Sequence, residues 1–191
     1  MKDRKLAIYL AGPDVFYPEA KAVGESLKAL CSQYGFEGIF PLDFLPSDLF
    51  TSKYTKKEAS ILIKNACVEG IKNSDILLAN MTPFRGVSMD IGTGFEMGYA
   101  DAMGLAVYGY SNDPRSYIEK IIAAEFGAEL YSGAFVDREG QIIEDLNNID
   151  NCMVTEACGN IFYPDPFGMT AFEKALKYIH GYVNADSFLK A

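Results

Sequence analysis

Short apolar runs alternate with longer amphipathic stretches along most of the chain. The apolar runs have the length of buried β-strands and end at glycine, proline or polar residues. The amphipathic stretches repeat apolar residues at a spacing of three or four, which is typical of helices that pack on one side. The runs that predict strands are 5–10, 36–40, 75–81 and 104–110. The stretches that predict helices are 18–34, 55–73, 90–103, 114–124 and 170–183.

Strands that alternate with helices through short links predict a parallel sheet with helices on both faces. We therefore expect a single domain over residues 1–191 with an α/β fold. Its sheet should be doubly wound, flavodoxin-like, parallel and five-stranded, in the order 2-1-3-4-5. The pattern places the first four strands only. Residues 126–151 are the least regular stretch, with a turn-like Asp-Arg-Glu-Gly at 137–140, and we expect them to lie over the site or at an interface.

The predicted strand order also predicts where a ligand binds. In doubly wound sheets, the ligand crevice lies outside the carboxyl ends of the strands at the point where the strand order reverses. Here that point falls between the first and third strands. We therefore expect the residues that directly follow Leu10 and Asn80 to line the site.

Two common nucleotide-binding motifs are missing from this crevice. The first strand ends in Ala-Gly-Pro-Asp at 11–14, where a dinucleotide-binding fold would need Gly-x-Gly-x-x-Gly. The glycine-rich segment 92–98 belongs to a later strand–helix unit, and no Lys-Ser or Lys-Thr follows a glycine-rich loop. We therefore expect no dinucleotide cofactor, no P-loop and no other cofactor.

Two carboxylates, Asp90 and Glu96, follow the third strand. With Asp90 at the helix entry and Glu96 about a turn and a half further on, both could reach one cavity, and Gly92 would leave space for a substrate ring. The positive end of the helix dipole favours an ionised Glu96, which could attack an anomeric carbon, and Tyr9 on the first strand could donate a hydrogen bond to it. The alternatives are an N-cap for Asp90, a solvated carboxylate for Glu96 and a core aromatic for Tyr9.

Composition narrows the classes of partner. The chain has 191 residues, 49% of them hydrophobic, and a net charge of −9 without a basic patch, which argues against a nucleic acid polymer as partner. No run approaches the roughly 20 apolar residues that span a membrane, and no signal peptide is recognisable, so we expect a cytoplasmic location. The four cysteines have no metal-site spacing and the one histidine is His180, so we expect no metal site.

Four segments resemble the nucleoside 2-deoxyribosyltransferase family. They are Ile-Tyr-Leu-Ala-Gly-Pro at 8–13, Pro-Leu-Asp at 41–43, Pro-Phe-Arg-Gly at 83–86 and Asp-Ile-Gly-Thr-Gly-Phe-Glu-Met-Gly-Tyr-Ala at 90–100. The resemblance implies an enzyme of nucleotide salvage that transfers the 2-deoxyribosyl group between nucleobases through a covalent glutamyl intermediate. It implies that Glu96 is the nucleophile, that Tyr9 orients it and that Asp90 binds the sugar 5'-hydroxyl.

The resemblance also implies the partners. The expected ligands are a deoxynucleoside and a free nucleobase. A neighbouring subunit would contribute an asparagine, aligned with Asn151, so that the protein would be a homo-oligomer whose site is completed in trans. The other residues expected to bind substrate are Gly12, Asp14, Phe16, Pro41, Asp43, Phe84, Arg85 and Gly92.

One position departs from the family. Many members carry an acidic residue near the base at the position of Cys67, and a thiol is a poorer acid for a purine nitrogen. We therefore expect a different activation of the base, an altered base preference or a reduced activity. Two alternative functions stay open: an N-glycosidase of 2'-deoxynucleosides or their 5'-monophosphates, and a non-catalytic binder of nucleotide derivatives. Monophosphate hydrolases of this kind have a serine at the position of Asp90, whose charge would repel a phosphate.

Overall fold

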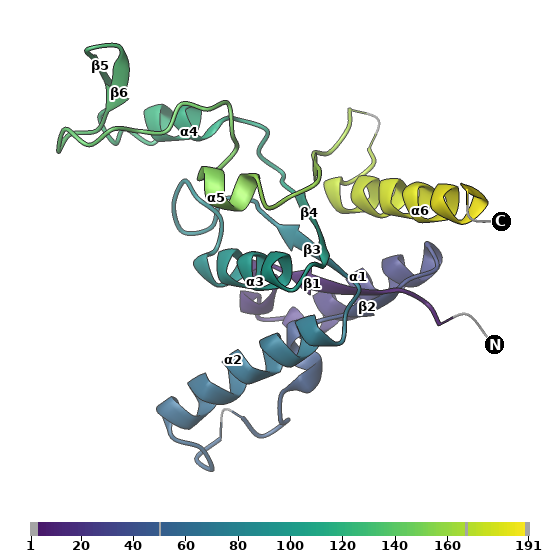
Figure 1. The fold of residues 1–191 in the computed structure, drawn as a ribbon. Helices are drawn as coiled ribbons and strands as arrows, with labels where there is room; N and C mark the ends of the chain where they lie inside the picture. Colours follow the sequence, from purple (N-terminus) through teal and green to yellow (C-terminus); the bar gives the residue numbers. More distant parts are fainter. Residues whose placement is uncertain (1–3, 50, 167, 190–191) are drawn as a thin grey trace.

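The computed structural model describes residues 4–49, 51–166 and 168–189. Its main sheet is parallel and five-stranded, in the order β2-β1-β3-β4-β7 (Figure 1). The predicted order is therefore confirmed, with β7 in the place of the fifth strand. The strands are β1 (Ala7–Ala11), β2 (Glu37–Ile39), β3 (Ile76–Asn80), β4 (Ala106–Tyr110) and β7 (Ile161–Phe162).

Two helices cover each face of the sheet. Helices α1 (Ala20–Gln33) and α6 (Ala171–Leu189) pack on one face, and α2 (Lys56–Lys72) and α3 (Ile91–Ala102) pack on the other (Figure 1). Within the described ranges, no helix combines the length and the apolar character needed to cross a membrane. The helices confirm the predicted layers on both sides of the sheet.

The residues of β1 alternate between these two layers, as the period of a strand requires. Ile8 and Leu10 pack in the apolar cluster with residues of α1 and α6, whereas Tyr9 and Ala11 pack in the cluster with residues of α2 and α3. All five residues of β1 are buried. This alternation points the Tyr9 side chain toward α3.

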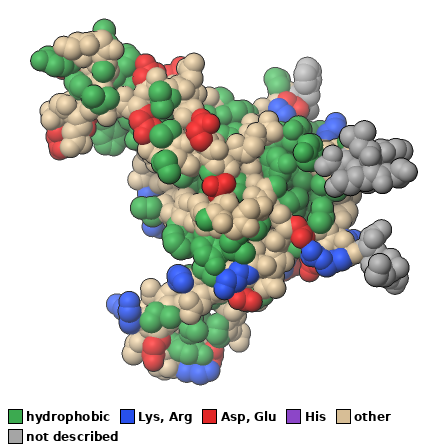
Figure 2. Space-filling view, in the orientation of Figure 1, with side chains coloured by type: hydrophobic (Ala, Val, Ile, Leu, Met, Phe, Trp, Pro, Cys, Tyr) green, Lys and Arg blue, Asp and Glu red, His purple; other side chains and the backbone are tan. Residues whose placement is uncertain are grey.

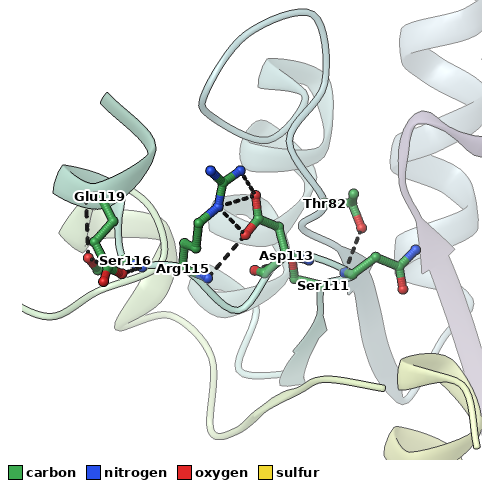
Figure 3. Close-up of polar contacts among 7 residues, drawn as sticks. Thr82, Ser111, Asp113, Arg115, Ser116 and Glu119 are labelled. Atoms are coloured by element: carbon green, nitrogen blue, oxygen red, sulfur yellow. Dashed lines mark hydrogen bonds and ion pairs between the residues drawn. The ribbon is translucent and has the colours of Figure 1, made fainter. Parts of the chain in front are cut away.

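Side-chain caps fix the starts of the helices around the sheet. Thr55 and Glu58 form a capping box at α2, and Ser116 and Glu119 form another at α4 (Tyr117–Ala123). The predicted fourth helix was expected to begin earlier, at 114. It begins at Tyr117, directly after the Ser116 cap, and Asp113 pairs with Arg115 at 2.6 Å in the loop before that cap (Figure 3). Two 3-10 turns, η1 (Pro13–Phe16) and η2 (Pro41–Phe44), follow β1 and β2.

The stretch 126–151, predicted as irregular, contains a short antiparallel hairpin of β5 (Glu129–Tyr131) and β6 (Ala134–Val136). Together with α4 it forms an arm, residues 117–136, that projects away from the sheet (Figure 1). The chain then returns to α3 through α5 (Cys152–Thr155), where Val154 lies beside Gly94 of α3. The hairpin strands are exposed or half-buried, so they carry no alternation that a sequence pattern could reveal.

Candidate functional site

Glu96 and Tyr9 form a buried hydrogen-bonded pair between α3 and the sheet. The Tyr9 hydroxyl donates to Glu96 Oε1 at 2.7 Å. Tyr9 is 0% exposed and Glu96 is 7% exposed. The phenol comes from the middle of β1 and the carboxyl from the second turn of α3, so two elements that are 87 residues apart in sequence meet here.

Burial governs the protonation of this pair. It raises the pKa of Glu96 to about 7, while the hydrogen bonds from Tyr9 and Cys67 lower it and the charge of Asp90 raises it. The helix dipole was expected to favour the ionised form of Glu96, but the net effect of its surroundings favours the protonated form. The dipole acts mainly in the first turn of α3, and Glu96 lies in the second, so desolvation outweighs the dipole there. The pKa of Tyr9 is raised far above its usual value by burial and by the Glu96 charge, so its hydroxyl remains a hydrogen-bond donor.

The raised pKa of Glu96 makes a prediction for stability. Because the folded state holds the proton more tightly than the unfolded chain, stability falls as the pH rises from about 4.5 to about 7. Glu96→Gln removes this cost and keeps an oxygen for Tyr9. At about pH 8 we expect the free energy of unfolding of the variant to exceed that of the wild type by up to about 3 kcal/mol, so that it unfolds at a higher urea concentration. At about pH 4 the two proteins should unfold at the same urea concentration. A variant less stable than wild type at the higher pH would contradict the assigned ionisation.

Asp90 is the N-cap of α3, which was the alternative to a substrate-binding role in the sequence analysis. Its Oδ2 accepts hydrogen bonds from the Thr93 backbone N–H at 3.0 Å and from Thr93 Oγ1 at 3.2 Å. Its Oδ1 has no hydrogen-bond partner among the described residues and is available to a ligand. A Cβ at Gly92 would lie 2.9 Å from Asp90 Oδ2, so the glycine keeps space for the cap. The capping role and a ligand-binding role are compatible because they use different oxygens.

Cys67, at the position of the family's acidic residue, lies in α2 beside this pair. It packs against the apolar cluster that contains Tyr9, and its thiol interacts with both Tyr9 and Glu96. Burial and the Glu96 charge raise the pKa of the Cys67 thiol to about 11. The thiol is therefore neutral near pH 7 and a weak acid. The sequence singled out Cys67 by its alignment with the family's acidic position, but only the structure shows that it interacts with Glu96.

A second group of predicted residues lies on the other face of the sheet. Phe16 and Phe84 stack with ring centroids 5.2 Å apart, and the Arg85 guanidinium lies 5.1 Å and 4.6 Å from the two centroids. Asp14 Oδ2 accepts a hydrogen bond from Asn80 Nδ2 at 2.9 Å. Asp14, Phe16 and Phe84 line a hollow of about 420 Å³ that α1 and α6 also border. The structure thus divides the predicted site between the two faces.

Gly12 lies at the boundary between these two groups. A Cβ at this position would approach Asn80 Cβ to 2.7 Å and Asp14 Oδ2 to 2.8 Å. The ends of β1 and β3 therefore approach closely only because residue 12 is glycine. Residues after Leu10 and residues after Asn80, among them Asp14 and Thr82, line the same hollow, as the strand order predicts.

Pro41 and Asp43 lie in the turn after β2, and their contacts are structural. Pro41 is buried at the start of η2. Asp43 accepts a hydrogen bond of 2.9 Å from the Phe40 backbone N–H and pairs with Lys28 of α1 at 2.9 Å. These contacts tie the end of β2 to α1.

Asn151 is exposed and caps α5. Its Oδ1 accepts from the Met153 backbone N–H at 3.0 Å, and its Nδ2 donates to Glu144 Oε1 at 2.6 Å. Beside it, Asp150 Oδ2 accepts a hydrogen bond of 2.7 Å from the Met89 backbone N–H. Glu144 and Asp150 were not predicted as site residues. Both lie in an irregular stretch, and no sequence signal distinguishes them from the other acidic residues there, such as the adjacent Asp145.

The fold and this site together define a class of protein: a doubly wound α/β domain in which a buried carboxyl group of α3 accepts a hydrogen bond from a tyrosine of β1. Residues 8–153 match the family described as nucleoside 2-deoxyribosyltransferase, and the chain belongs to this family. The resemblance of the four motifs is thereby confirmed.

The chain is also similar to solved structures and to a curated protein. The 2-desoxiribosyltransferase from Leishmania mexicana is 27% identical, with a TM-score of 0.64 over 92% of this chain and 97% of that one. An uncharacterized protein of Schizosaccharomyces pombe is 28% identical over 94% of this chain and 90% of its own length. A conserved protein from Enterococcus faecalis, 18% identical with a TM-score of 0.52 over 91% of this chain and 96% of that one, shares the fold.

Proposed function

We propose that the protein transfers the 2-deoxyribosyl group between nucleobases by a retaining double displacement with Glu96 as nucleophile. The observation that carries this proposal is the 2.7 Å hydrogen bond from Tyr9 to a buried Glu96. It occurs in a member of the nucleoside 2-deoxyribosyltransferase family, and a structural neighbour over 92% of the chain is described as such a transferase.

Each displacement forms one bond at the anomeric carbon with an electron pair of the nucleophile and breaks another, whose pair leaves with the leaving group. In the first, a Glu96 oxygen bonds to this carbon while the bond to the base nitrogen breaks, and the base leaves with that electron pair. In the second, a nitrogen of the incoming base bonds to the same carbon and gives up its proton to solvent, while the ester C–O bond breaks with its electron pair on Glu96, which restores the carboxylate. Two inversions return the original configuration. Tyr9 holds one carboxyl oxygen in place throughout.

The departing base has to take up a proton, and Cys67 is a poor source. Its thiol, with a pKa of about 11, is a much weaker acid than the carboxyl group that the family places there. We therefore propose that solvent supplies this proton. Bases that leave easily without acid assistance should be the better substrates.

Asp90 is proposed to bind the sugar 5'-hydroxyl through Oδ1. We expect Asp90→Asn to raise KM for a 2'-deoxynucleoside about tenfold, because an amide nitrogen replaces one acceptor oxygen. Asparagine is also a good N-cap, so the start of α3 should be retained. Steady-state kinetics with 2'-deoxyinosine measure the change. Asp101→Asn, an exposed site later in α3, is the matched control. An unchanged KM would mean that Asp90 serves only as a cap.

We propose that the active form is a homo-oligomer whose site is completed by Asn151 and its neighbours from a second copy. Several apolar side chains project from α3 and α5: Ile91 is 90% exposed, Phe95 55% and Met153 77%. Apolar side chains also gather on the arm (Figure 2). Exposed apolar groups on this scale support an interface.

A charge on this surface should dissociate the oligomer. We expect Ile91→Asp to shift the mass in solution toward the monomer and to lower transfer at least about tenfold, because burying an unpaired carboxylate opposes association. Analytical ultracentrifugation measures the mass. Ile61→Asp, at a site on α2 that is 46% exposed, is the control and should change neither property. A wild-type monomer with full activity would contradict completion of the site in trans.

The test of the proposed function is a base-exchange assay across the four natural deoxynucleosides, each with and without a second free base. Formation of a new deoxynucleoside supports transfer. Release of free deoxyribose without exchange would identify an N-glycosidase instead. Binding without either product would identify a non-catalytic binder of nucleotide derivatives. A parallel assay with 5'-monophosphates should give no product, because Asp90 would repel the phosphate.

A further inference from the structure

Asp150 connects two segments that the proposed reaction uses. Its Oδ2 accepts a 2.7 Å hydrogen bond from the Met89 backbone N–H, and its Oδ1 accepts one of 2.8 Å from the Asn151 backbone N–H. Met89 directly precedes Asp90, which is the N-cap of α3. One carboxylate therefore holds both the entry of the helix that carries Glu96 and the backbone of Asn151.

The surroundings of Asp150 hold it firmly. It is 2% exposed, and the preceding Ile149 packs in the same apolar cluster as Tyr9. The Thr155 hydroxyl donates to the Asp150 backbone carbonyl at 3.1 Å, which fixes the backbone as well as the side chain. Met89 is also buried in this cluster. Both ends of the hydrogen bond between Asp150 and Met89 are thus fixed in a packed interior.

Helix α4 supplies an opposite charge. Lys120 is 3% exposed; burial lowers its pKa and the charge of Asp150 raises it. The start of α4 is fixed by the capping box of Ser116 and Glu119, which lies just before Lys120 (Figure 3). Buried charges are costly without compensation, and the two hydrogen bonds to Asp150 together with the charge of Lys120 provide it.

We propose that Asp150 is a positioning residue for the transfer reaction, which holds Asp90 in a fixed orientation at the entry of α3. It acts through the Met89 N–H and does not itself contact the substrate. Since Asp90 is the residue proposed to receive the 5'-hydroxyl, Asp150 determines how well the enzyme recognises that hydroxyl. This inference rests on the proposed function.

The experiment replaces Asp150 by asparagine, which has the same shape but keeps only one acceptor oxygen for the two N–H donors. We compare kcat/KM for 2'-deoxyinosine with that for 2',5'-dideoxyinosine, which lacks the hydroxyl. The wild type should prefer the first by about tenfold or more. In Asp150→Asn this preference should fall to about threefold or less, with a smaller change for the dideoxy substrate. Asp145→Asn, at an exposed site nearby, should retain the wild-type preference.

A preference that stays at the wild-type value would overturn the proposal. If kcat/KM falls by the same factor for both substrates, this result would mean that Asp150 only stabilises the fold. If Asp150→Asn does not fold, Thr155→Val provides the same comparison, because it removes only the hydrogen bond to the Asp150 carbonyl. The preference should then fall in the same direction by a smaller factor.

A second measurement separates this inference from the proposed function. Amide hydrogen exchange of peptides covering 86–93 should be faster in Asp150→Asn than in Asp145→Asn, because the Met89 N–H loses its acceptor. This readout needs no activity. If the wild type catalyses no transfer, the proposed function fails while faster exchange still supports the structural link. Unchanged exchange would reject the link itself.

Discussion

Replacing Glu96 by glutamine is expected to reduce deoxyribosyl transfer at least about a thousandfold while the chain remains folded. The amide preserves the shape and the acceptor for the Tyr9 hydroxyl, which donates to Glu96 Oε1 at 2.7 Å. It cannot form the ester, because an amide oxygen is a far weaker nucleophile than a carboxylate. The measurement is the rate of base exchange, with circular dichroism to check the fold. Glu19→Gln, at an exposed position before α1, should retain full activity.

A covalent trap locates the same step in the wild type. A 2'-fluoro-substituted nucleoside slows the breakdown of the intermediate, so a deoxyribosyl ester should accumulate, and peptide mass spectrometry should place it on Glu96. An adduct on another residue would refute the assignment, and so would retention of substantial transfer by Glu96→Gln.

The second large effect is on the pH profile. Burial raises the pKa of Glu96 to about 7, and only the ionised carboxylate can attack. We therefore expect kcat/KM to fall about tenfold per pH unit below pH 7, and to be about a hundredfold lower at about pH 5 than on the plateau above about pH 8. Measuring kcat/KM for 2'-deoxyinosine across this range tests it. A flat profile down to about pH 5 would mean that the nucleophile is already ionised there.

Asp90 provides an internal check on this profile. Its negative charge is one of the causes that raise the pKa of Glu96. Asp90→Asn should therefore move the acidic limb of the profile to lower pH, whereas the control Asp101→Asn should leave it in place. A shift to higher pH would contradict the conclusion that the charge of Asp90 raises the pKa of Glu96.

The predictability of the fold followed the strength of the local signals. Strands β1, β2, β3 and β4 were predicted from apolar runs, because a parallel strand is buried on both faces and its sequence is mostly apolar. Their order was predicted from the alternation of these runs with helices. The fifth strand, Ile161–Phe162, has two residues and forms only beside β4. The hairpin of β5 and β6 is exposed, so packing imposes no pattern on its side chains.

The sequence by itself determined the chain's fold class and its family motifs, and it offered the pairing of Glu96 with Tyr9 as one of two interpretations. Both interpretations rest on local periodicities, which predict the face of the strand on which Tyr9 lies and the face of the helix on which Glu96 lies. Only the tertiary structure decided the burial that raises the pKa of Glu96, the separation of Phe16 and Phe84 onto the other face, and the contact of Asp150 with Met89. These properties depend on segments far apart in the chain, and desolvation exists only once those segments have excluded water.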